Sequence, residues 1–353
     1  MNYFRAEFFD VYMSYHNNIL LDKLHGVPTD RPPVWVMRQA GRILPGYRQI
    51  RKSVSGFKEL VKSPDLIAEV TLEPLHELGV DAPILFSDIL VIPEAMGVDY
   101  DIIEKQGPKF PNPITSPADI DRLVYGEDVL DRLDYVFESI TKTKARLSGS
   151  NPLIGFAGAP WTLFAYMIEG SGSKTFAKAR RFLYEHPKDS HRLMSRISSA
   201  TTAYVKQKIA SGADVIQLFD SWSGMLSRAQ YQEFCLPYIS AIMEAIEGTP
   251  RIFFPKGAWS SIPDFGDVPM EAIGVDWRTP ASYVREHLGE DLVIQGNMDP
   301  AFLYSDPDAI QSEVARISKD MGNQHIFNLG HGVYPDTDAN HVKAMVQAVK
   351  SLG

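Results

Sequence analysis

The stretch D-V-I-Q-L-F-D-S, residues 214–221, joins a short apolar run to an abrupt polar end. The run lacks a clean alternation of apolar and polar side chains, which is typical of a strand buried on both faces in a parallel sheet. Seven other short runs have the same character, and a polar or glycine-containing segment follows each of them. They are residues 34–37, 82–86, 152–156, 252–254, 272–275, 292–295 and 326–329.

Helical patterns lie between these runs. Ser63-Pro64-Asp65 combines a capping residue with a proline at the first helical position, and Gly79 closes the apolar pattern that follows. Similar helical patterns occupy residues 193–212, 229–247 (interrupted at Pro237), 310–317 and 342–349. Alternation of strand and helix eight times predicts a (β/α)₈ barrel, with a doubly wound open sheet as the alternative.

The barrel is expected to form one domain over residues 1–353, because no Ser/Gly-rich linker divides the chain. Residues 1–20 are interpreted as an N-terminal extension. Residues 97–150 form a long insertion after the second strand, in which we expect a hairpin at residues 99–107 and a helix at residues 131–147. Insertions of this length after barrel strands often serve as lids.

Composition restricts the class of protein. The formal net charge of −9 over 353 residues argues against nucleic acid or an anionic membrane surface as the main partner. An anionic small molecule stays possible, because a local cationic pocket can form in an acidic protein. The chain has one cysteine, Cys235, no apolar segment of signal-peptide character, and no apolar run near the ~18 residues that span a bilayer. These features favour a cytoplasmic protein.

The active sites of such barrels lie at the C-terminal ends of the strands. Nearly every predicted strand end in this chain is polar, which the packing of helices on a sheet does not require. The residues at these ends are Arg38, Gln39, Arg42, Ser87, Asp88, Gly158, Asp220, Ser221, Lys256, Asp276, Asn297, Gly330 and His331.

The first strand end, W-V-M-R-Q-A-G-R at residues 35–42, carries two arginines four residues apart. Each alone could be a structural ion-pair partner. Together they favour an anion site, because guanidinium groups are always charged and bind carboxylate or phosphate in a forked geometry. Further cations follow at Arg48, Arg51 and Lys52.

Four other side chains are candidates for the site. Asp88 ends a buried run, where a carboxylate is costly unless it is paired, caps a helix, or stabilises positive charge on a substrate. Ser221 is interpreted as a hydroxyl that binds a substrate carboxylate, since no base partner for a nucleophile is evident. Tyr166 could donate a hydrogen bond into a pocket or simply pack. His331, between two glycines, could be structural or could bind a ligand.

Several familiar motifs are incomplete. G-S-G-S-K-T at residues 170–175 lacks the glycine spacing of a phosphate-binding loop and follows a helix-like stretch instead of a strand. The G-H-G at residues 330–332 lacks the third glycine of a dinucleotide fingerprint. H-E-x-x-H is absent, and Cys235 stands inside a helical pattern, so no metal site is expected.

Taken together, these residues closely resemble the uroporphyrinogen decarboxylase family. Two long signatures carry the resemblance, P-V-W-V-M-R-Q-A-G-R at residues 33–42 and G-F-A-G-A-P-W-T-L-F-A-Y-M-I-E-G at residues 155–170. Ile43 departs from the tyrosine that the family commonly has. Shorter agreements are F-S-D-I-L (86–90), Q-L-F-D-S (217–221), Q-G-N-M-D-P (295–300) and N-L-G-H-G-V-Y-P (328–335).

The resemblance implies a single barrel, usually a homodimer, that needs no metal or organic cofactor. It implies conversion of the four acetates of uroporphyrinogen III to methyl groups, with release of carbon dioxide, to give coproporphyrinogen III in haem and related tetrapyrrole synthesis. It also implies catalytic roles for Asp88, Arg38 and Tyr166. The substrate-binding residues that it implies are Arg38, Gln39, Arg42, Arg51, Asp88, Tyr166, Ser221 and His331.

Three rival functions are compatible with parts of this sequence. A zinc-dependent corrinoid or thiol methyltransferase of the same superfamily would carry a histidine–cysteine zinc pair near the fifth strand, where this chain reads F-F-P-K-G-A-W at residues 253–259. A glycosidase would use two of Asp88, Asp220 and Asp276 and would leave the arginines unexplained. A non-catalytic tetrapyrrole carrier is the third.

Overall fold

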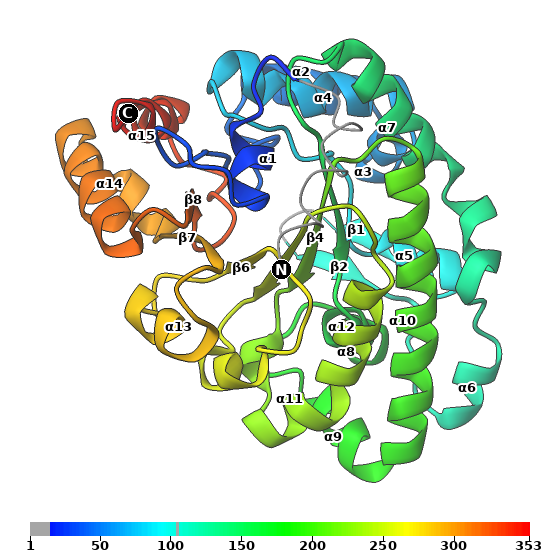
Figure 1. Cartoon of the computed structure of the whole chain (residues 1–353). Coiled ribbons are helices and arrows are strands. Elements are labelled where there is room, and N and C mark those ends of the chain that lie inside the picture. The colour runs from blue at the N-terminus through cyan, green and yellow to red at the C-terminus, as the bar shows by residue number, and fades with distance from the viewer. Residues whose placement is uncertain (1–14, 104–105) are drawn as a thin grey trace.

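The computed structural model describes residues 15–103 and 106–353 (Figure 1). Short 3₁₀ helices lie at Gly126–Arg132, Ser223–Met225, Trp259–Asp264 and Pro300–Tyr304. The strands are β1 (Asp101–Ile103), β2 (Gly107–Lys109), β3 (Ile154–Gly158), β4 (Val215–Asp220), β5 (Arg251–Pro255), β6 (Ala272–Gly274), β7 (Val293–Met298) and β8 (His325–Leu329). The helices are α1 (Ile19–Leu24), α2 (Pro45–Ser53), α3 (Phe57–Val61), α4 (Pro64–Glu77), α5 (Val91–Met96), α6 (Pro117–Asp121), α7 (Asp134–Leu147), α8 (Pro160–Glu169), α9 (Ala177–Glu185), α10 (Pro187–Ala210), α11 (Arg228–Phe234), α12 (Leu236–Glu244), α13 (Ala281–Leu288), α14 (Pro307–Met321) and α15 (Ala339–Lys350).

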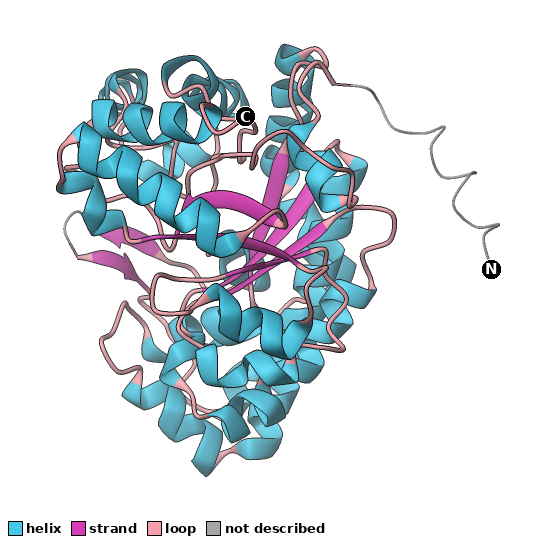
Figure 2. Cartoon of the chain, turned by 60° about the vertical axis from the view of Figure 1, so that its left-hand side comes forward, coloured by secondary structure: helices cyan, strands magenta, loops and turns pink. Residues whose placement is uncertain are grey.

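Six strands form a parallel sheet in the order β3-β4-β5-β6-β7-β8, with helices around it (Figures 1 and 2). These strands confirm six of the eight predicted runs. The predicted strands at residues 34–37 and 82–86 are wrong as strands, because each makes only one isolated bridge, Val34 with Phe327 and Ile84 with Ile154. Pro33 and Pro83 stand at the start of these two segments and have no amide hydrogen for a longer ladder.

The two segments nevertheless complete the ring. The amide of Asp81 donates to the carbonyl of Val34 at 2.8 Å, and Ile154 and Phe327 bond to the carbonyls of Pro83 and Pro33 at 2.9 Å and 2.8 Å. The fold is therefore the predicted (β/α)₈ barrel.

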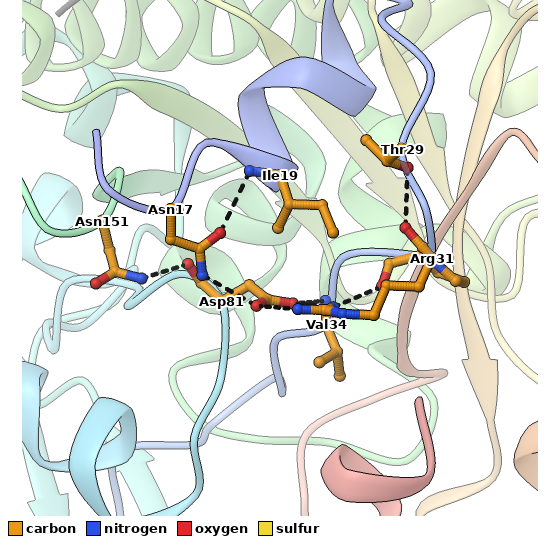
Figure 3. A network of polar contacts seen from close by, with 8 residues as sticks. Asn17, Ile19, Thr29, Arg31, Val34, Asp81 and Asn151 are labelled. Carbon is orange, nitrogen blue, oxygen red and sulfur yellow. Dashed lines mark hydrogen bonds and ion pairs between the residues drawn. The ribbon is translucent and has the colours of Figure 1, made fainter. Parts of the chain in front are cut away.

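A polar network replaces the missing ladder between the first two segments (Figure 3). Asp81, 1% exposed, accepts two hydrogen bonds from the Arg31 guanidinium at 2.7 Å and 2.8 Å. The same carboxylate accepts from the Val34 amide at 2.8 Å and from the Asn17 side chain at 3.1 Å. Asn151 Nδ2 donates to the backbone carbonyl of Asp81 at 2.9 Å. Side chains thus join backbone segments that in most sheets would be joined by a ladder.

The core lies on both faces of the barrel wall. Along residues 34–37, Trp35 and Met37 belong to the cluster that fills the barrel, whereas Val34 and Val36 pack in the layer beneath the helices. This alternation of two buried faces explains why the runs show no polar face in the sequence. Helix α1 covers one end of the barrel interior through Leu20, Leu21 and Leu24.

The predicted N-terminal extension, residues 1–20, falls mainly outside the described residues, which begin at Tyr15. Tyr15 and Leu20 pack in the interior cluster. No helix among the described residues is both long and apolar enough to cross a membrane.

The insertion after the second segment is folded against the barrel. The predicted hairpin is present as the antiparallel pair β1 and β2, although residues 104–105 at its turn lie outside the described ranges. The predicted helix begins slightly later, as α7. Amides of Phe110 and Ile114 donate to the carbonyls of Gly170 and Met167, both at 2.8 Å, which ties the insertion to α8 and the segment that follows it.

Candidate active site

Two adjoining cavities open beside the C-terminal ends of the strands. The smaller, about 220 Å³, lies at the barrel mouth, and the larger, about 1050 Å³, extends over the loop after residue 37 and helix α2. Both are lined by Arg38, Ala40, Phe86, Ser87 and Asp88, so the two cavities adjoin at these residues. This arrangement matches the position of ligand sites in such barrels.

The first loop aims Arg38 into this space. The Met37 amide donates to the Asn328 side chain at 3.0 Å, and the Met37 carbonyl accepts from the Val333 amide at 3.0 Å. Arg38 then adopts a φ of 62°, which turns the chain away from the strand direction. A Cβ at Gly332 would overlap Cγ and Cδ of Arg38, so a glycine is required at that position for the arginine to lie there.

Asp88 presents a carboxylate to both cavities. Its Oδ1 accepts from the Leu90 amide and its Oδ2 from the Tyr100 hydroxyl, each at 3.0 Å. Burial raises the pKa of Asp88 above its usual range, and the two hydrogen bonds and the charge of Arg38 oppose that rise. The site therefore holds a carboxylate that the protein only partly compensates.

The larger cavity is strongly cationic. Arg42, Arg48, Arg51 and Lys52 line it together with Arg38. Within the described residues, none of these five cations forms a salt bridge with a carboxylate. Arg48 donates only to the backbone carbonyls of Arg42 and Ile43. Cations left without carboxylate partners in an acidic chain favour a polyanionic ligand.

Ser221 and His331 line the smaller cavity. The ring of His331 lies parallel to that of Phe254, with 6.5 Å between centroids. Burial, with Lys256 and Arg38 nearby, lowers the pKa of His331 to about 3. The imidazole is therefore neutral at physiological pH and offers its ring nitrogens to a ligand as hydrogen-bonding groups.

Tyr166 stands on α8 beside these cavities. Its ring packs edge-on against Phe176 and Trp222, at centroid distances of 5.7 Å and 6.2 Å. Burial raises the pKa of the Tyr166 hydroxyl, on which the charges of Asp88 and Arg38 act in opposite directions. Tyr166 is thus close to the same site, although it is not among the residues lining the two cavities.

Gln39, like Tyr166, is a predicted site residue that does not line either cavity. It is fully buried, its Oε1 accepts from the Val36 amide at 3.1 Å, and its Nε2 donates to the Ala82 carbonyl at 3.2 Å. It joins the first two barrel segments.

The other two strand-end carboxylates are already occupied. Asp220 is buried and accepts from the hydroxyls of Thr162 and Tyr231 at 2.6 Å and 2.7 Å. Asp276, 1% exposed, is paired with Arg278 at 2.6 Å. Neither lines the two cavities, so the pair of facing carboxylates that a glycosidase needs is not found in the described part of the site. The described residues also contain no group of three or more His, Cys, Asp or Glu that could hold a metal ion.

Two residues near the site were given no role from the sequence, although one of them, Lys256, was among the polar strand ends. Tyr100, in the insertion, bonds Asp88, and no sequence pattern marks it. Lys256 follows β5, is half-buried, and affects the pKa of His331. Its position at the end of the fifth predicted strand indicated that it could lie near the site.

The buried histidines lead to a prediction about pH. Burial lowers the pKa of His325 to about 4 and contributes to the value of about 3 for His331, whereas an unfolded histidine titrates near ~6.5. As pH falls below ~6.5, these two histidines bind protons in the unfolded chain but not in the folded chain, so together they lower stability with a slope approaching two protons. Burial raises the pKa of Asp220 to about 6, so its proton uptake in the folded chain offsets part of this slope. Urea unfolding at pH 7.5, 6.0 and 5.0 measures this. His331→Asn should reduce the slope by about one proton, and an unchanged slope would contradict the assignment.

Comparison with known proteins agrees with this geometry. The model of the family described as uroporphyrinogen decarboxylase (URO-D) matches residues 15–352. A protein of Chlorobium phaeobacteroides named uroporphyrinogen decarboxylase is 46% identical over 343 residues, covering 95% of this chain and 97% of the relative. One from Salinibacter ruber with the same name is 44% identical over 341 residues, covering 95% and 96%.

Solved structures show the same fold. A methyltransferase from Methanosarcina mazei superposes with a TM-score of 0.79 at 21% identity, covering 96% of this chain and 99% of that one. At that identity the likeness extends to the fold alone. The matched family model and the relatives with above 40% identity decide the family: this chain is a member of the uroporphyrinogen decarboxylase family.

Proposed function

We propose that this protein is a uroporphyrinogen decarboxylase that converts the four acetates of uroporphyrinogen III to methyl groups, giving coproporphyrinogen III and four carbon dioxide molecules. The observation that carries the proposal is that Asp88 and several cations without carboxylate partners line the same two adjoining cavities. A substrate with eight carboxylates and four pyrrole N–H groups needs both kinds of partner.

The chemistry requires an electron sink. Protonation of a pyrrole ring carbon gives a cation. The bond to the carboxylate then breaks, its electron pair neutralises the ring as an exocyclic methylene, and carbon dioxide leaves. A second proton on the methylene carbon and loss of the first restore an aromatic pyrrole with a methyl group. Because the ring accepts the electrons, we propose that no metal or organic cofactor takes part.

The residues are assigned accordingly. Asp88 faces the pyrrole N–H groups and stabilises the cation, as a fixed charge in a partly desolvated site can do. Arg38 binds the reacting acetate and takes part in delivering the proton, directly or through a water molecule. Its guanidinium is by itself a poor acid, because its pKa is high. Tyr166 is assigned a catalytic role beside them.

The remaining assignments concern binding. Arg42 and Arg51 bind substrate carboxylates in the larger cavity, and Ser221 and His331 donate hydrogen bonds in the smaller one. Gln39 acts indirectly, by joining the segments that carry Arg38 and Asp88.

We further propose that the protein is a cytoplasmic homodimer of single-domain chains, as is usual in the family. Sedimentation equilibrium that returns the mass of one chain would contradict the dimer.

Anaerobic incubation with uroporphyrinogen III tests the function. After oxidation, products separated by carboxyl count should form a ladder from eight carboxylates to four. A binding signal without any ladder would support a carrier instead. Stoichiometric zinc in the purified protein would favour the methyltransferase alternative.

Arg42→Ala is expected to raise KM by about tenfold, since a charge-assisted contact contributes roughly 1.5 kcal/mol or more to binding. It should raise KM more than Asp88→Asn does, because Asp88 acts on the cation and not on the carboxylates. Steady-state rates at low and high salt measure this, and the difference should shrink as salt screens the cavity. Equal Michaelis constants in the two variants would count against an anion clamp at Arg42.

A further inference from the structure

Tyr100 reaches the active site from outside the barrel. It lies between α5 and β1 in the long insertion, and only 1% of its surface is exposed. Its hydroxyl donates to Asp88 Oδ2 at 3.0 Å, while the Leu90 amide donates to Oδ1 at 3.0 Å. Each oxygen of Asp88 therefore has one protein donor, and its remaining lone pairs are left for the cavity.

The ring of Tyr100 is held on two sides. Phe110 packs against it at a centroid distance of 5.7 Å, and Lys58 Nζ lies 4.6 Å from the ring centroid. Lys58 is in turn paired with Glu94 of α5 at 2.8 Å. These contacts fix the direction in which the hydroxyl points, so the hydrogen bond to Asp88 does not depend on a freely rotating side chain.

Asp88 needs this support because its surroundings disfavour its charge. Burial is the main cause that raises the pKa of Asp88, and the charge of Glu94 adds to it. Burial and the neighbouring acids also raise the pKa of Tyr100 far above its ordinary value, so its hydroxyl keeps its proton and stays a donor at every working pH. The titratable or charged side chains coupled to Asp88 are Arg38, Glu94, Tyr100, Tyr135, Tyr166 and Tyr204. Among the described residues, Tyr100 alone gives the carboxylate a side-chain hydrogen bond.

We propose that Tyr100 is a positioning residue for the decarboxylation, whose hydroxyl keeps Asp88 ionised and oriented so that its free lone pairs face the cavity. This inference rests on the proposed function of Asp88 as the counter-charge. It also gives the insertion a defined part in the site, because a side chain of the insertion supplies one of the two donors that hold the carboxylate.

Tyr100→Phe removes the hydroxyl and keeps the ring. The expected result is a fall in kcat of about tenfold with KM within about twofold, since loss of one hydrogen bond to a charged group is at the low end worth a factor of ten. In a plot of kcat against pH, the acidic limb should shift to higher pH by about one unit, because losing a donor makes the Asp88 carboxylate easier to protonate.

Tyr135→Phe is the matched control. The charge of Asp88 acts on Tyr135, but Tyr135 forms no hydrogen bond to Asp88, so this variant should keep the native rate and pH profile. A pH profile that moves equally in both variants, or in neither, would overturn the proposal. In the Asp88→Asn background, Tyr100→Phe should lower kcat by less than twofold, and a full additional tenfold loss would show that Tyr100 acts independently of Asp88.

A direct titration separates this inference from the proposed function. In protein labelled with ¹³C at the Asp carboxyl carbons, the Asp88 resonance is identified by its loss in Asp88→Asn. Its pKa should rise in Tyr100→Phe and not in Tyr135→Phe. An unchanged pKa overturns the role of Tyr100 whatever the activity, whereas a raised pKa in a protein that does not decarboxylate uroporphyrinogen III counts only against the proposed function.

Discussion

Asp88→Asn is expected to lower kcat by about 10²–10³-fold, the usual loss when a group that stabilises developing charge is removed. The amide keeps the size of the side chain but carries no charge to stabilise a protonated pyrrole. It can still accept a hydrogen bond from Leu90 or Tyr100, so the fold and most of the binding should persist. Initial rates under anaerobic conditions, with products separated by carboxyl count, measure the effect.

Asp99→Asn is a suitable control for that variant. Asp99 lies nearby in the sequence, in the insertion after the second barrel segment, is exposed, and forms no hydrogen bond or salt bridge among the described residues. It should keep the native rate. An Asp88→Asn enzyme that retains more than about a tenth of the native kcat would be incompatible with the counter-charge role.

Asp81→Ala is expected to have the largest effect on stability, lowering the free energy of unfolding by roughly 3–5 kcal/mol. The substitution leaves the Arg31 guanidinium without its partner and the buried Val34 amide without an acceptor. It also removes the polar junction that replaces the ladder between the first two barrel segments. Urea unfolding followed by circular dichroism measures the change.

Two further variants make that test specific. Arg31→Met removes the cation but leaves Asp81 with the Val34 and Asn17 donors, so it should cost less than Asp81→Ala. The double variant should be less destabilised than the sum of the two single losses, because the partners act as a unit. If Asp81→Ala lowers the free energy of unfolding by less than ~1 kcal/mol, the polar network around Asp81 is not what stabilises this junction.

The strands were predictable where both faces of a run are buried. Residues 214–219 became β4 because Val215 and Ile216 pack on opposite faces of one wall, which leaves no polar periodicity. Residues 34–37 have the same pattern but could not form a full strand, since Pro33 removes a donor and Arg38 turns the chain. Apolar runs report burial, whereas the length of a ladder depends on donors that the pattern does not show.

The sequence predicts which residues stand at the strand ends, but it does not predict which of their side chains are bound by other residues. Asp88, Asp220 and Asp276 look equivalent in the sequence. They differ because Thr162 and Tyr231 bond Asp220 and Arg278 pairs with Asp276. Thr162 and Tyr231 lie far from Asp220 in the sequence, so no local pattern connects them, whereas Arg278 is only two residues from Asp276.

The direction of the Gln39 side chain could not be predicted from its position in the sequence. Gln39 lies between two arginines that face the cavity, yet its amide turns inward to bond Val36 and Ala82.

The junction between the first two barrel segments has a mechanical consequence. A full ladder joins β3 to β4, but between residues 34–37 and 81–86 the described structure has one backbone hydrogen bond, from the Asp81 amide to the Val34 carbonyl, supported by side chains. Few backbone hydrogen bonds therefore hold this junction, and Arg38 and Asp88 follow its two segments. The hydrogen bonds of the Gln39 and Asp81 side chains join the two segments and so help to set the distance between Arg38 and Asp88. Neither Gln39 nor Asp81 lines the cavities.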